Sequence, residues 1–557
     1  MTRMVAETAR TIESNSKQNA AQGILGSRWG ILALGLVLIL VVGVRIHLSD
    51  IPLERDEGEY AYAGQLMLEG IAPFSRAYNM KLPGIYMAYA AIMALLGQTH
   101  VAIHLGLLIV NVATCILVLF LGRRLWDDMT GFCGAIFFAI LSLSPDVDGV
   151  FANSEHFVLL PALGGILLLF YALDSGKRLA FLAAGILMGL GFTIKQHGVF
   201  FILFGVFTIV VTEWRRSNST FRKSLLHVLI FVVGAALPYL LLCVIMWKAG
   251  VFDRFWFWTV TYAREYVSQI PLSMVPDILV YNHRETVANA FVIWLLAVTG
   301  LLYMLVRVRS DNRSVPAIAF LLFSVASVCP GLYFRSHYFI LLVPAISICA
   351  GVTVSALWKS AKEKISVPVA GALVGIITIV AVSWVCYSCR QFLFQSDSST
   401  ASRMVHGANP FPESLIVADY LAQNTSPDDT VAVLGSEPQI FFYSQRKSAT
   451  GFIYTYPLTE GHPFASELQR EMAREIVESK PKYLLYVHVS TSWGWTNRSD
   501  RFILRWFEKY TKDFCELVGT VKIVPPSPTV YDLGQTNLTY PPKTEYWLAL
   551  FRRRTPS

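Results

Sequence analysis

Long apolar stretches alternate with short polar ones over most of this chain. Between residues 29 and 388 the apolar stretches are roughly 17–25 residues long, the length of helix that spans a bilayer. The predicted spans lie near 29–48, 100–122, 130–145, 155–173, 179–194, 197–213, 225–248, 287–306, 316–331, 336–357 and 366–388. We therefore predict a mainly α polytopic membrane protein with about eleven transmembrane helices and additional interfacial helices.

The two ends of the chain follow other patterns. Residues 1–26 are polar, and the first apolar run is long and lacks an evident small-residue cleavage site. We therefore expect a cytoplasmic tail at 1–28 and a first span that is retained.

Residues 400–557 have the pattern of a soluble sequence. The predicted helices there are 412–423 and 464–479, and the predicted strands are 430–435 and 483–487. Alternating helices and strands favour a partly parallel sheet in a small α/β domain at 391–557. The sequence indicates no catalytic group in this domain, so we expect it to stabilise the protein or handle an acceptor.

Composition agrees with a membrane protein. The chain has 557 residues, of which 54% are hydrophobic and 15% charged, with a mean hydropathy of +0.50. Soluble domains carry about 25% charged residues. The net charge of +8 is largely explained by basic loops, so it indicates no nucleic-acid partner.

Basic residues in five short loops predict the orientation, because such loops are cytoplasmic in membrane proteins. The clusters are Arg123/Arg124, Lys177/Arg178, Arg215/Arg216/Arg222/Lys223, Arg307/Arg309/Arg313 and Lys359/Lys362/Lys364. All five lie inside only if the N-terminus is inside and 85–96 does not cross. That segment is short and follows Pro-Gly, so we expect an interfacial helix. The transmembrane part at 29–390 then precedes an exoplasmic C-terminal domain.

Other polar residues near apolar segments then gather on the exoplasmic side. They lie in the loops 49–99, 146–156, 195–198, 250–285 and 333–338. A solvated loop explains any one of them, but it explains their one-sidedness poorly. We therefore predict one shared exoplasmic site.

The first of these loops carries the strongest candidate chemistry. Asp56 and Glu57 closely follow the first span, and Lys81 returns to the same surface. Ionisable groups this close to hydrocarbon are costly unless they line a hydrated cavity or have a partner. Carboxylates supply a base and a lysine supplies an anion site, which indicates a phosphorylated substrate. The alternative is that Asp56 and Glu57 are only the solvated first turn of a helix, where acids are favoured.

Three motifs and the overall layout resemble a known superfamily. The motifs are Asp56-Glu57-x-x-Tyr60, Lys81-x-Pro83 and Asn153-Ser154-Glu155. Over roughly residues 30–390 the chain resembles the polyprenyl-phosphate-sugar-dependent glycosyltransferases of the GT-C superfamily. Within it, the chain is similar to protein O-mannosyltransferases and the lipid A aminoarabinose transferase (glycosyltransferase family 39-like). The resemblance implies an integral, multi-pass protein of the bacterial inner membrane with an exoplasmic active site.

The resemblance also implies roles for particular residues. The first-loop aspartate of such enzymes is catalytic and the lysine contacts the donor phosphate, which here are Asp56 and Lys81. In the aminoarabinose transferase a glutamate beside the lysine helps to bind a metal, whereas this chain has Met80. We therefore assign no metal or other cofactor, and leave open whether a divalent metal is required.

Physical chemistry extends these roles. A phosphate ester leaves without protonation, so the reaction needs a base for the acceptor hydroxyl and cations for the phosphate. We choose Asp56 as the base, because a carboxylate near low dielectric becomes more basic. Glu155 orients the acceptor or supports Asp56, and Glu57 either supports it or caps the helix. After Lys81, the candidate phosphate ligands are Arg335 and His337, followed by the weaker candidates Lys195, His197, Arg264 and His283.

The predicted activity is therefore inverting transfer of a sugar from a polyprenyl-phosphate donor to a hydroxyl acceptor on a lipid, glycan or protein. A polysaccharide ligase or polymerase is the nearest alternative. A transporter or flippase would place ionisable groups at the membrane midplane within an inverted repeat, which the sequence does not indicate. A non-enzymatic receptor or assembly factor leaves Asp56, Glu57 and Lys81 unexplained. The sequence identifies neither the sugar nor the acceptor.

Overall fold

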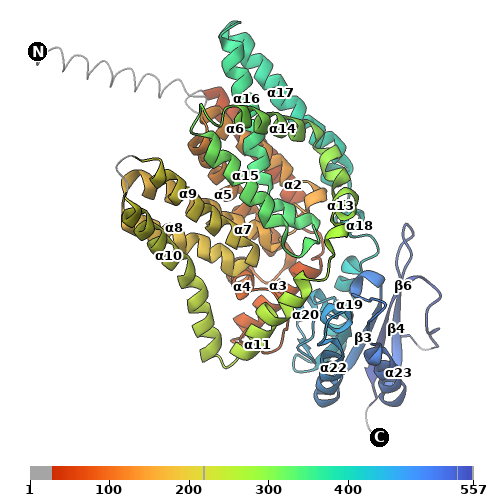
Figure 1. Ribbon diagram of the computed structural model, residues 1–557. Coiled ribbons are helices and arrows are strands. Elements are labelled where there is room, and N and C mark those ends of the chain that lie inside the picture. Colours follow the sequence, from red (N-terminus) through yellow and green to blue (C-terminus); the bar gives the residue numbers. More distant parts are fainter. Residues whose placement is uncertain (1–27, 217–219, 536, 555–557) are drawn as a thin grey trace, which may run out of the picture.

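The computed structural model describes residues 28–216, 220–535 and 537–554. They form a large helical part and a C-terminal α/β domain that sits against one end of it (Figure 1). The predicted cytoplasmic tail lies almost wholly outside the described residues. The helices of the first part are α2 (Arg28–His47), α3 (Arg55–Leu68), α4 (Pro83–Leu96), α5 (His100–Leu125), α6 (Asp128–Leu141), α7 (Ser154–Ser175), α8 (Arg178–Ile194), α9 (Val199–Trp214), α10 (Phe221–Lys248), α11 (Phe252–Trp256), α12 (Ala263–Val267), α13 (Val275–Asn289), α14 (Phe291–Val306), α15 (Ser314–Val328), α16 (Val343–Lys362) and α17 (Val367–Ser388).

Each predicted span coincides with a helix, but not every helix is long enough to cross a bilayer by itself. Within the described residues six helices are long and apolar enough to cross a membrane, or seven if one bent pair is a single span. That pair is Leu272–Asn289 and Phe291–Val306, which meet at 101°. Apolar segments in α2, α4, α6, α8 and α15 are shorter. The structure therefore supports several spans without fixing their number at eleven.

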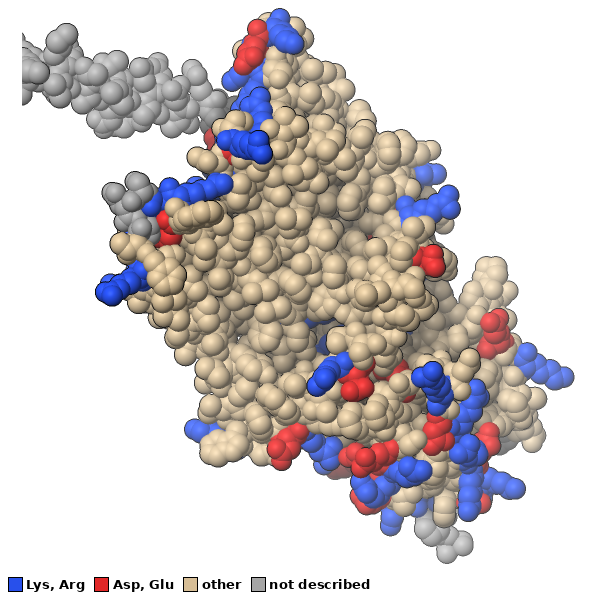
Figure 2. Space-filling view, viewed as in Figure 1, with Lys and Arg blue, Asp and Glu red and all other residues tan. Residues whose placement is uncertain are grey.

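Charge is unevenly distributed over the surface. In Figure 2 most Lys, Arg, Asp and Glu side chains lie over the C-terminal domain or at the far end of the helical part. A broad surface between them carries almost no charge on the face shown. Exposed apolar side chains such as Leu240, Leu241 and Ile379 belong to helices of this middle region. Such a belt is typical of a surface that faces lipid rather than water.

The C-terminal domain contains a mixed six-stranded sheet. Its elements are α18 (Ser398–His406), α19 (Phe411–Asn424), β1 (Thr430–Leu434), α20 (Gln439–Ser444), β2 (Lys447–Ser448), α21 (Tyr456–Thr459), α22 (Ala465–Ser479), β3 (Tyr483–His488), α23 (Phe502–Phe514), β4 (Cys515–Ile523), β5 (Val530–Leu533) and β6 (Tyr546–Arg553). The strand order is β2-β1-β3-β6-β4-β5, with β1 parallel to β2 and β3 and the other pairs antiparallel. The predicted strands and helices are present, and the sheet is partly parallel as expected.

Helix α3 joins the two parts of the molecule. Its buried Tyr60 and Tyr62 belong to one apolar cluster with Val433 and Leu485 of the sheet. A Cβ at Gly58 would lie 2.6 Å from the backbone nitrogen of Gln439, so only glycine permits the close approach of α20 to α3. The helix with the candidate chemistry is therefore fixed by the C-terminal domain.

Candidate functional site

Two adjoining cavities lie between the helical part and the C-terminal domain. The larger has a volume of about 970 Å³ and the smaller about 100 Å³. The residues that line both cavities are Glu54, Arg55, Arg335, His337, Tyr456 and Glu460. Asp56 and Lys81 line the smaller cavity. The first loop, where the sequence predicted a site, therefore borders a cavity, and side chains from both parts of the chain form its wall.

Asp56 accepts hydrogen bonds on both carboxylate oxygens. The Lys81 Nζ atom is 2.7 Å from Oδ2 and the Tyr454 hydroxyl is 2.7 Å from Oδ1. Tyr60 donates to Oδ2 at 3.4 Å, and the His337 Nε2 atom lies 4.0 Å from the same oxygen. This arrangement brings together three parts of the chain that the sequence predicted to meet, and adds Tyr454.

The environment of Asp56 lowers its pKa. Burial by itself disfavours the charged form, but the positive charge of Lys81, followed by His337 and the hydrogen bonds from Lys81 and Tyr454, holds the pKa of Asp56 well below its usual value. The same ion pair raises the pKa of Lys81 despite burial. The expectation that low dielectric makes Asp56 more basic is therefore wrong for this state, because the paired cation outweighs the loss of solvent.

Glu57 is turned away from the cavities and caps α3. Glu54 accepts hydrogen bonds from the backbone N–H groups of Asp56 and Glu57, and Glu57 accepts one from the backbone of Glu54, which completes a capping box. The other Glu57 oxygen accepts hydrogen bonds from His104 at 3.0 Å and from the backbone of Ala152. The sequence left two roles open for Glu57, and the structure shows the helix-capping role. Among the described residues, Glu57 makes no side-chain hydrogen bond to Asp56.

Glu155 lies in the first turn of α7 and forms a buried ion pair with Lys195, which directly follows α8. The Glu155 carboxylate is 0% exposed and the Lys195 side chain 7%. Burial lowers the pKa of Lys195 despite its anionic partner. His337 lies between this ion pair and Asp56, with its Nε2 atom 4.0 Å from the Glu155 carboxylate. Lys195 therefore neutralises Glu155 rather than lining either cavity.

Arg335 lines both cavities. Its backbone belongs to a loop in which two residues that are not glycine have positive φ values. Leu332 and Phe334 have φ values of 58° and 44°, and the carbonyl of Phe334 accepts a hydrogen bond of 2.7 Å from His283. Arg335 is exposed as a residue, but its guanidinium lies over the ring of Tyr333 and interacts with Tyr266. Within the part of the chain that the structure describes, no ion pair involves Arg335. Arg335 is therefore a cation without a carboxylate partner among the described residues.

Of the remaining sequence candidates, Arg264 and His197 lie outside the cavities, whereas His337 lines both. Arg264 is exposed and lines neither of them. His197 is buried and donates to the carbonyl of Ser327 at 2.8 Å, so it fastens a loop to α15. His337 is in the site as expected, and its Nδ1 atom lies 3.5 Å from Asp148.

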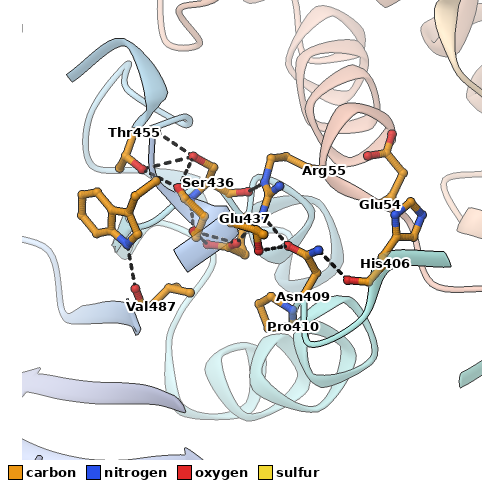
Figure 3. A network of polar contacts seen from close by, with 12 residues as sticks. Glu54, Arg55, His406, Asn409, Pro410, Ser436, Glu437, Thr455 and Val487 are labelled. Carbon is orange, nitrogen blue, oxygen red and sulfur yellow. Dashed lines mark hydrogen bonds and ion pairs between the residues drawn. The ribbon is translucent and has the colours of Figure 1, made fainter. Parts of the chain in front are cut away.

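The C-terminal domain supplies site residues that the sequence analysis missed. Arg55, next to the catalytic candidate, donates to the carbonyl of Ser436 at 2.6 Å, to Tyr456 at 2.8 Å and to Asn409 at 3.0 Å, and pairs with Glu437 at 3.2 Å. Figure 3 shows this network between α3 and the loops of the domain. The aromatic run Tyr454-Thr455-Tyr456 was the available signal, but a short aromatic run in a soluble domain normally indicates core packing.

Two buried carboxyl groups have raised pKa values. Burial, followed by the negative charges of Glu155, Glu57 and Asp56, raises the pKa of Asp148 to about 8. Burial also raises the pKa of Glu59 to about 8, although Tyr86 and Asn79 donate to its oxygens. Both shifts favour the neutral carboxyl forms, which lowers the negative charge near Asp56.

The donor set does not fit a resident metal. Both oxygens of Asp56 already accept hydrogen bonds from Lys81 and Tyr454. Among the described residues, no group of three or more His, Cys, Asp or Glu side chains is arranged to hold a metal ion. The neighbouring Met80 supplies only a soft thioether.

Comparison with known proteins supports the resemblance. The family model of dolichyl-phosphate-mannose-protein mannosyltransferases matches residues 81–247. An undecaprenyl phosphate-alpha-4-amino-4-deoxy-L-arabinose arabinosyl transferase of Pseudomonas aeruginosa is 27% identical over 247 residues, which are 41% of this chain and 42% of that protein. The chain thus spans less than half the length of the curated relatives that it matches.

Solved structures share the fold over nearly the whole chain. ArnT from Cupriavidus metallidurans, bound to undecaprenyl phosphate, has a TM-score of 0.55 at 13% identity, covering 92% of this chain and 99% of that one. The Archaeoglobus fulgidus oligosaccharyltransferase has a TM-score of 0.56 at 13% identity, covering 92% of this chain and 75% of that one. The chain therefore shares the fold of these membrane glycosyltransferases and is similar in part of its sequence to proteins of the same kind, as its motifs indicated.

Proposed function

We propose that this protein is an inverting glycosyltransferase that moves a sugar from a polyprenyl-phosphate donor to a hydroxyl acceptor at the exoplasmic face of the membrane. The observation that carries the proposal is the Asp56–Lys81 pair in a cavity that Arg335, which forms no ion pair with a described residue, also lines. A base and two cations are the groups that transfer from a phosphate ester requires.

The names of the relatives favour this class of donor. The Pseudomonas relative is named for an undecaprenyl phosphate-linked aminoarabinose donor, and ArnT was solved with undecaprenyl phosphate bound. The archaeal oligosaccharyltransferase was solved with a dolichol-phosphate and an inhibitory peptide. A polyprenyl phosphate with a sugar attached is therefore the donor that we propose here, whereas the sugar and the acceptor stay open among lipid, glycan and protein.

The donor phosphate would bind between Lys81 and Arg335. When Lys81 turns from Asp56 to the phosphate, it removes the charge that keeps the pKa of Asp56 low. Asp56 then becomes a stronger base at the moment when the donor is in place. Donor binding and base activation are thus coupled through one lysine, which explains why a carboxylate with a low pKa in the free protein can still act as the base.

The proposed step is a single in-line displacement. The acceptor oxygen forms a bond to the anomeric carbon as the bond from that carbon to the phosphate oxygen breaks, and the bonding electrons leave with the phosphate. The acceptor hydroxyl proton passes to Asp56. Lys81 and Arg335 stabilise the added charge on the phosphate, and attack from the opposite face inverts the anomeric centre.

Neighbouring groups would position these reactants. Tyr454 holds Asp56 through its second oxygen, and His337 lies between Asp56 and the Glu155–Lys195 pair. The larger cavity, which the C-terminal domain closes with Tyr456 and Trp493, has room for the acceptor. We therefore assign the domain a role in acceptor handling as well as in stabilising α3.

We propose eleven spans, with α4 in the exoplasmic interface and the C-terminal domain outside a bacterial inner membrane, because this topology places all five basic clusters inside. Single cysteines at Ser399 and Ser360, which are both exposed, test the orientation. An impermeant maleimide added to intact spheroplasts is expected to label Ser399→Cys and not Ser360→Cys. The reverse labelling would contradict the topology.

Turnover of a short-chain polyprenyl-phosphate sugar by the purified protein tests the activity. Released polyprenyl phosphate, with inverted configuration in the product, is expected if the protein is a transferase. Movement of an intact lipid-linked sugar across proteoliposomes, without cleavage of the donor, would identify a flippase and contradict the proposal.

A further inference from the structure

A second charged cavity lies at the other end of the helical part from Asp56. Its volume is about 350 Å³, within the range of about 300–1,000 Å³ of small-molecule sites. Helix α7 connects the two places, because Glu155 in its first turn is at the Asp56 site and Asp174 near its end lines this cavity. At 1.5 Å per residue, the two positions are about 28 Å apart along the helix axis.

The cavity is formed where three helices end and a fourth begins. The ends of α5, α7 and α9 and the segment before α15 contribute to its wall. The lining charges are Arg124, Arg215, Arg216, Arg313 and Asp174. Four cations thus face one carboxylate among the lining residues.

Ion pairs leave part of this positive charge available. Arg124 binds Asp174 at 2.8 Å, and Arg313 binds Asp311 at 2.6 Å. Arg216 is 3.4 Å from buried Glu213, a longer contact, and its side chain is 38% exposed. Arg215 is exposed and forms no ion pair with any residue that the structure describes. Arg215 and Arg216 are therefore the cations most ready to bind an anion.

The rest of the wall is apolar, with one buried hydroxyl. Phe170, Leu173, Phe207 and Val211 line the cavity beside the arginines. Thr208 also lines it, and its Oγ1 atom is buried without a hydrogen-bond partner among the described residues. A buried hydroxyl without a partner is uncommon in native proteins and indicates a missing ligand or water.

This cavity differs from an ordinary basic loop, because it lies at the edge of the apolar belt. Basic residues are favourable at helix C-termini and in cytoplasmic loops, so their presence alone requires no ligand. Here, however, they border a cavity whose other walls are aromatic and aliphatic, at the ends of helices that span the apolar belt. The arginines suit the phosphate of a phospholipid headgroup, and the phenylalanines suit its hydrocarbon chains. Basic pockets between membrane helices bind such headgroups.

We propose that this cavity binds an anionic phospholipid of the leaflet opposite the Asp56 site. The headgroup phosphate lies between Arg215 and Arg216, with Asn312 as a further donor, and the chains follow the wall of Phe170 and Phe207. The site is independent of sugar transfer and ties α5, α7, α9 and α15 together at the end of the molecule away from the C-terminal domain.

Native mass spectrometry of the purified full chain, titrated with short-chain phosphatidylglycerol, tests the proposal. The parent is expected to bind one molecule saturably, and phosphatidylcholine more weakly. The double variant Arg215→Gln/Arg216→Gln is expected to lose at least about tenfold in apparent affinity, since it removes charge-assisted hydrogen bonds. The matched control Arg222→Gln/Lys223→Gln changes the same charge at exposed residues that do not line the cavity.

Each other result would overturn the proposal. Equal losses in both double variants would mean that only general surface charge attracts the lipid. Equal binding of phosphatidylcholine would remove the role of the anion. Competition by inorganic phosphate as strong as that by phosphatidylglycerol would identify a free anion as the ligand. Loss of binding in Lys81→Met would place the lipid at the Asp56 site instead. A thermal unfolding scan of each variant separates loss of binding from loss of fold.

Discussion

Two lysine–carboxylate pairs lie within the same region of this protein, and they differ in access. The Asp56–Lys81 pair, from the segment of α3 and α4, has side chains that are 18% and 14% exposed. The Glu155–Lys195 pair, from the ends of α7 and α8, has side chains that are 0% and 7% exposed. His337 lies between the two carboxylates, 4.0 Å from each.

From this difference in access we infer that Asp56 and Lys81 are the reactive pair and that Glu155 and Lys195 are a structural pair. Lys81 can exchange Asp56 for a phosphate, because both groups reach a cavity. Lys195 cannot leave Glu155 for a phosphate in the same way. Separating the two would leave a buried charge without a partner, which is strongly unfavourable. Two lysine–carboxylate pairs that look alike in the sequence thus have different expected roles. Substitutions in each pair are expected to have effects of different size and kind.

Asp56→Asn is expected to have the largest effect. It keeps the shape of the side chain but removes the proton acceptor, so turnover should fall by about 10²–10⁴-fold, the usual contribution of a positioned base. Donor binding should change little. The control Asp277→Asn makes the same change at an exposed residue outside both cavities. Near-normal turnover would move the base to Glu155.

Lys81→Met should weaken donor binding by about 10–100-fold, because it removes charge-assisted hydrogen bonds to the phosphate. The measurement is the dissociation constant for a short-chain polyprenyl phosphate, with Lys248→Met as an exposed control. Unchanged affinity in folded protein would show that Lys81 serves only as the partner of Asp56.

Single changes in the buried pair should act mainly on stability. Glu155→Gln or Lys195→Met leaves one buried charge unpaired and should cost about 3–5 kcal/mol of unfolding free energy. The double variant should recover a substantial part of that loss, since it removes both charges. Thermal unfolding of the three proteins in detergent measures this. If Lys195→Met were stable but bound donor as weakly as Lys81→Met, both pairs would be phosphate sites.

Tyr454→Phe should have the smallest effect, a loss of several-fold to about tenfold in turnover, because one hydrogen bond to a charged group is removed. That bond lowers the pKa of Asp56. Without it the pKa rises, so the acid limb of the pH–rate profile should move to higher pH. A loss of turnover with an unmoved limb would make the role of Tyr454 purely structural. Tyr281→Phe, at an 88% exposed side chain, is the control.

The pattern of this site was partly predictable. The first loop, Lys81, Arg335 and His337 could be found from the sequence, because ionisable residues beside apolar spans are conspicuous. The opposite direction of the pKa shift at Asp56 could not be predicted, since it depends on a 2.7 Å contact to Lys81. Tyr454 was also hidden, since it is separated from Asp56 by almost 400 residues of chain.

By itself, the sequence determined the membrane class, the placement of the helices, the presence of a partly parallel C-terminal sheet and the loop that carries Asp56. These features follow from periodicity, span length and local preferences, which act over a few residues at a time. Only the tertiary structure decided that Glu57 caps α3 and that Lys195 forms an ion pair with Glu155. It also decided that Arg55 and Tyr454 connect the C-terminal domain to the site. Those outcomes depend on which side chains meet across distant segments, and the charge, burial and hydrogen bonding of a group are set by those meetings.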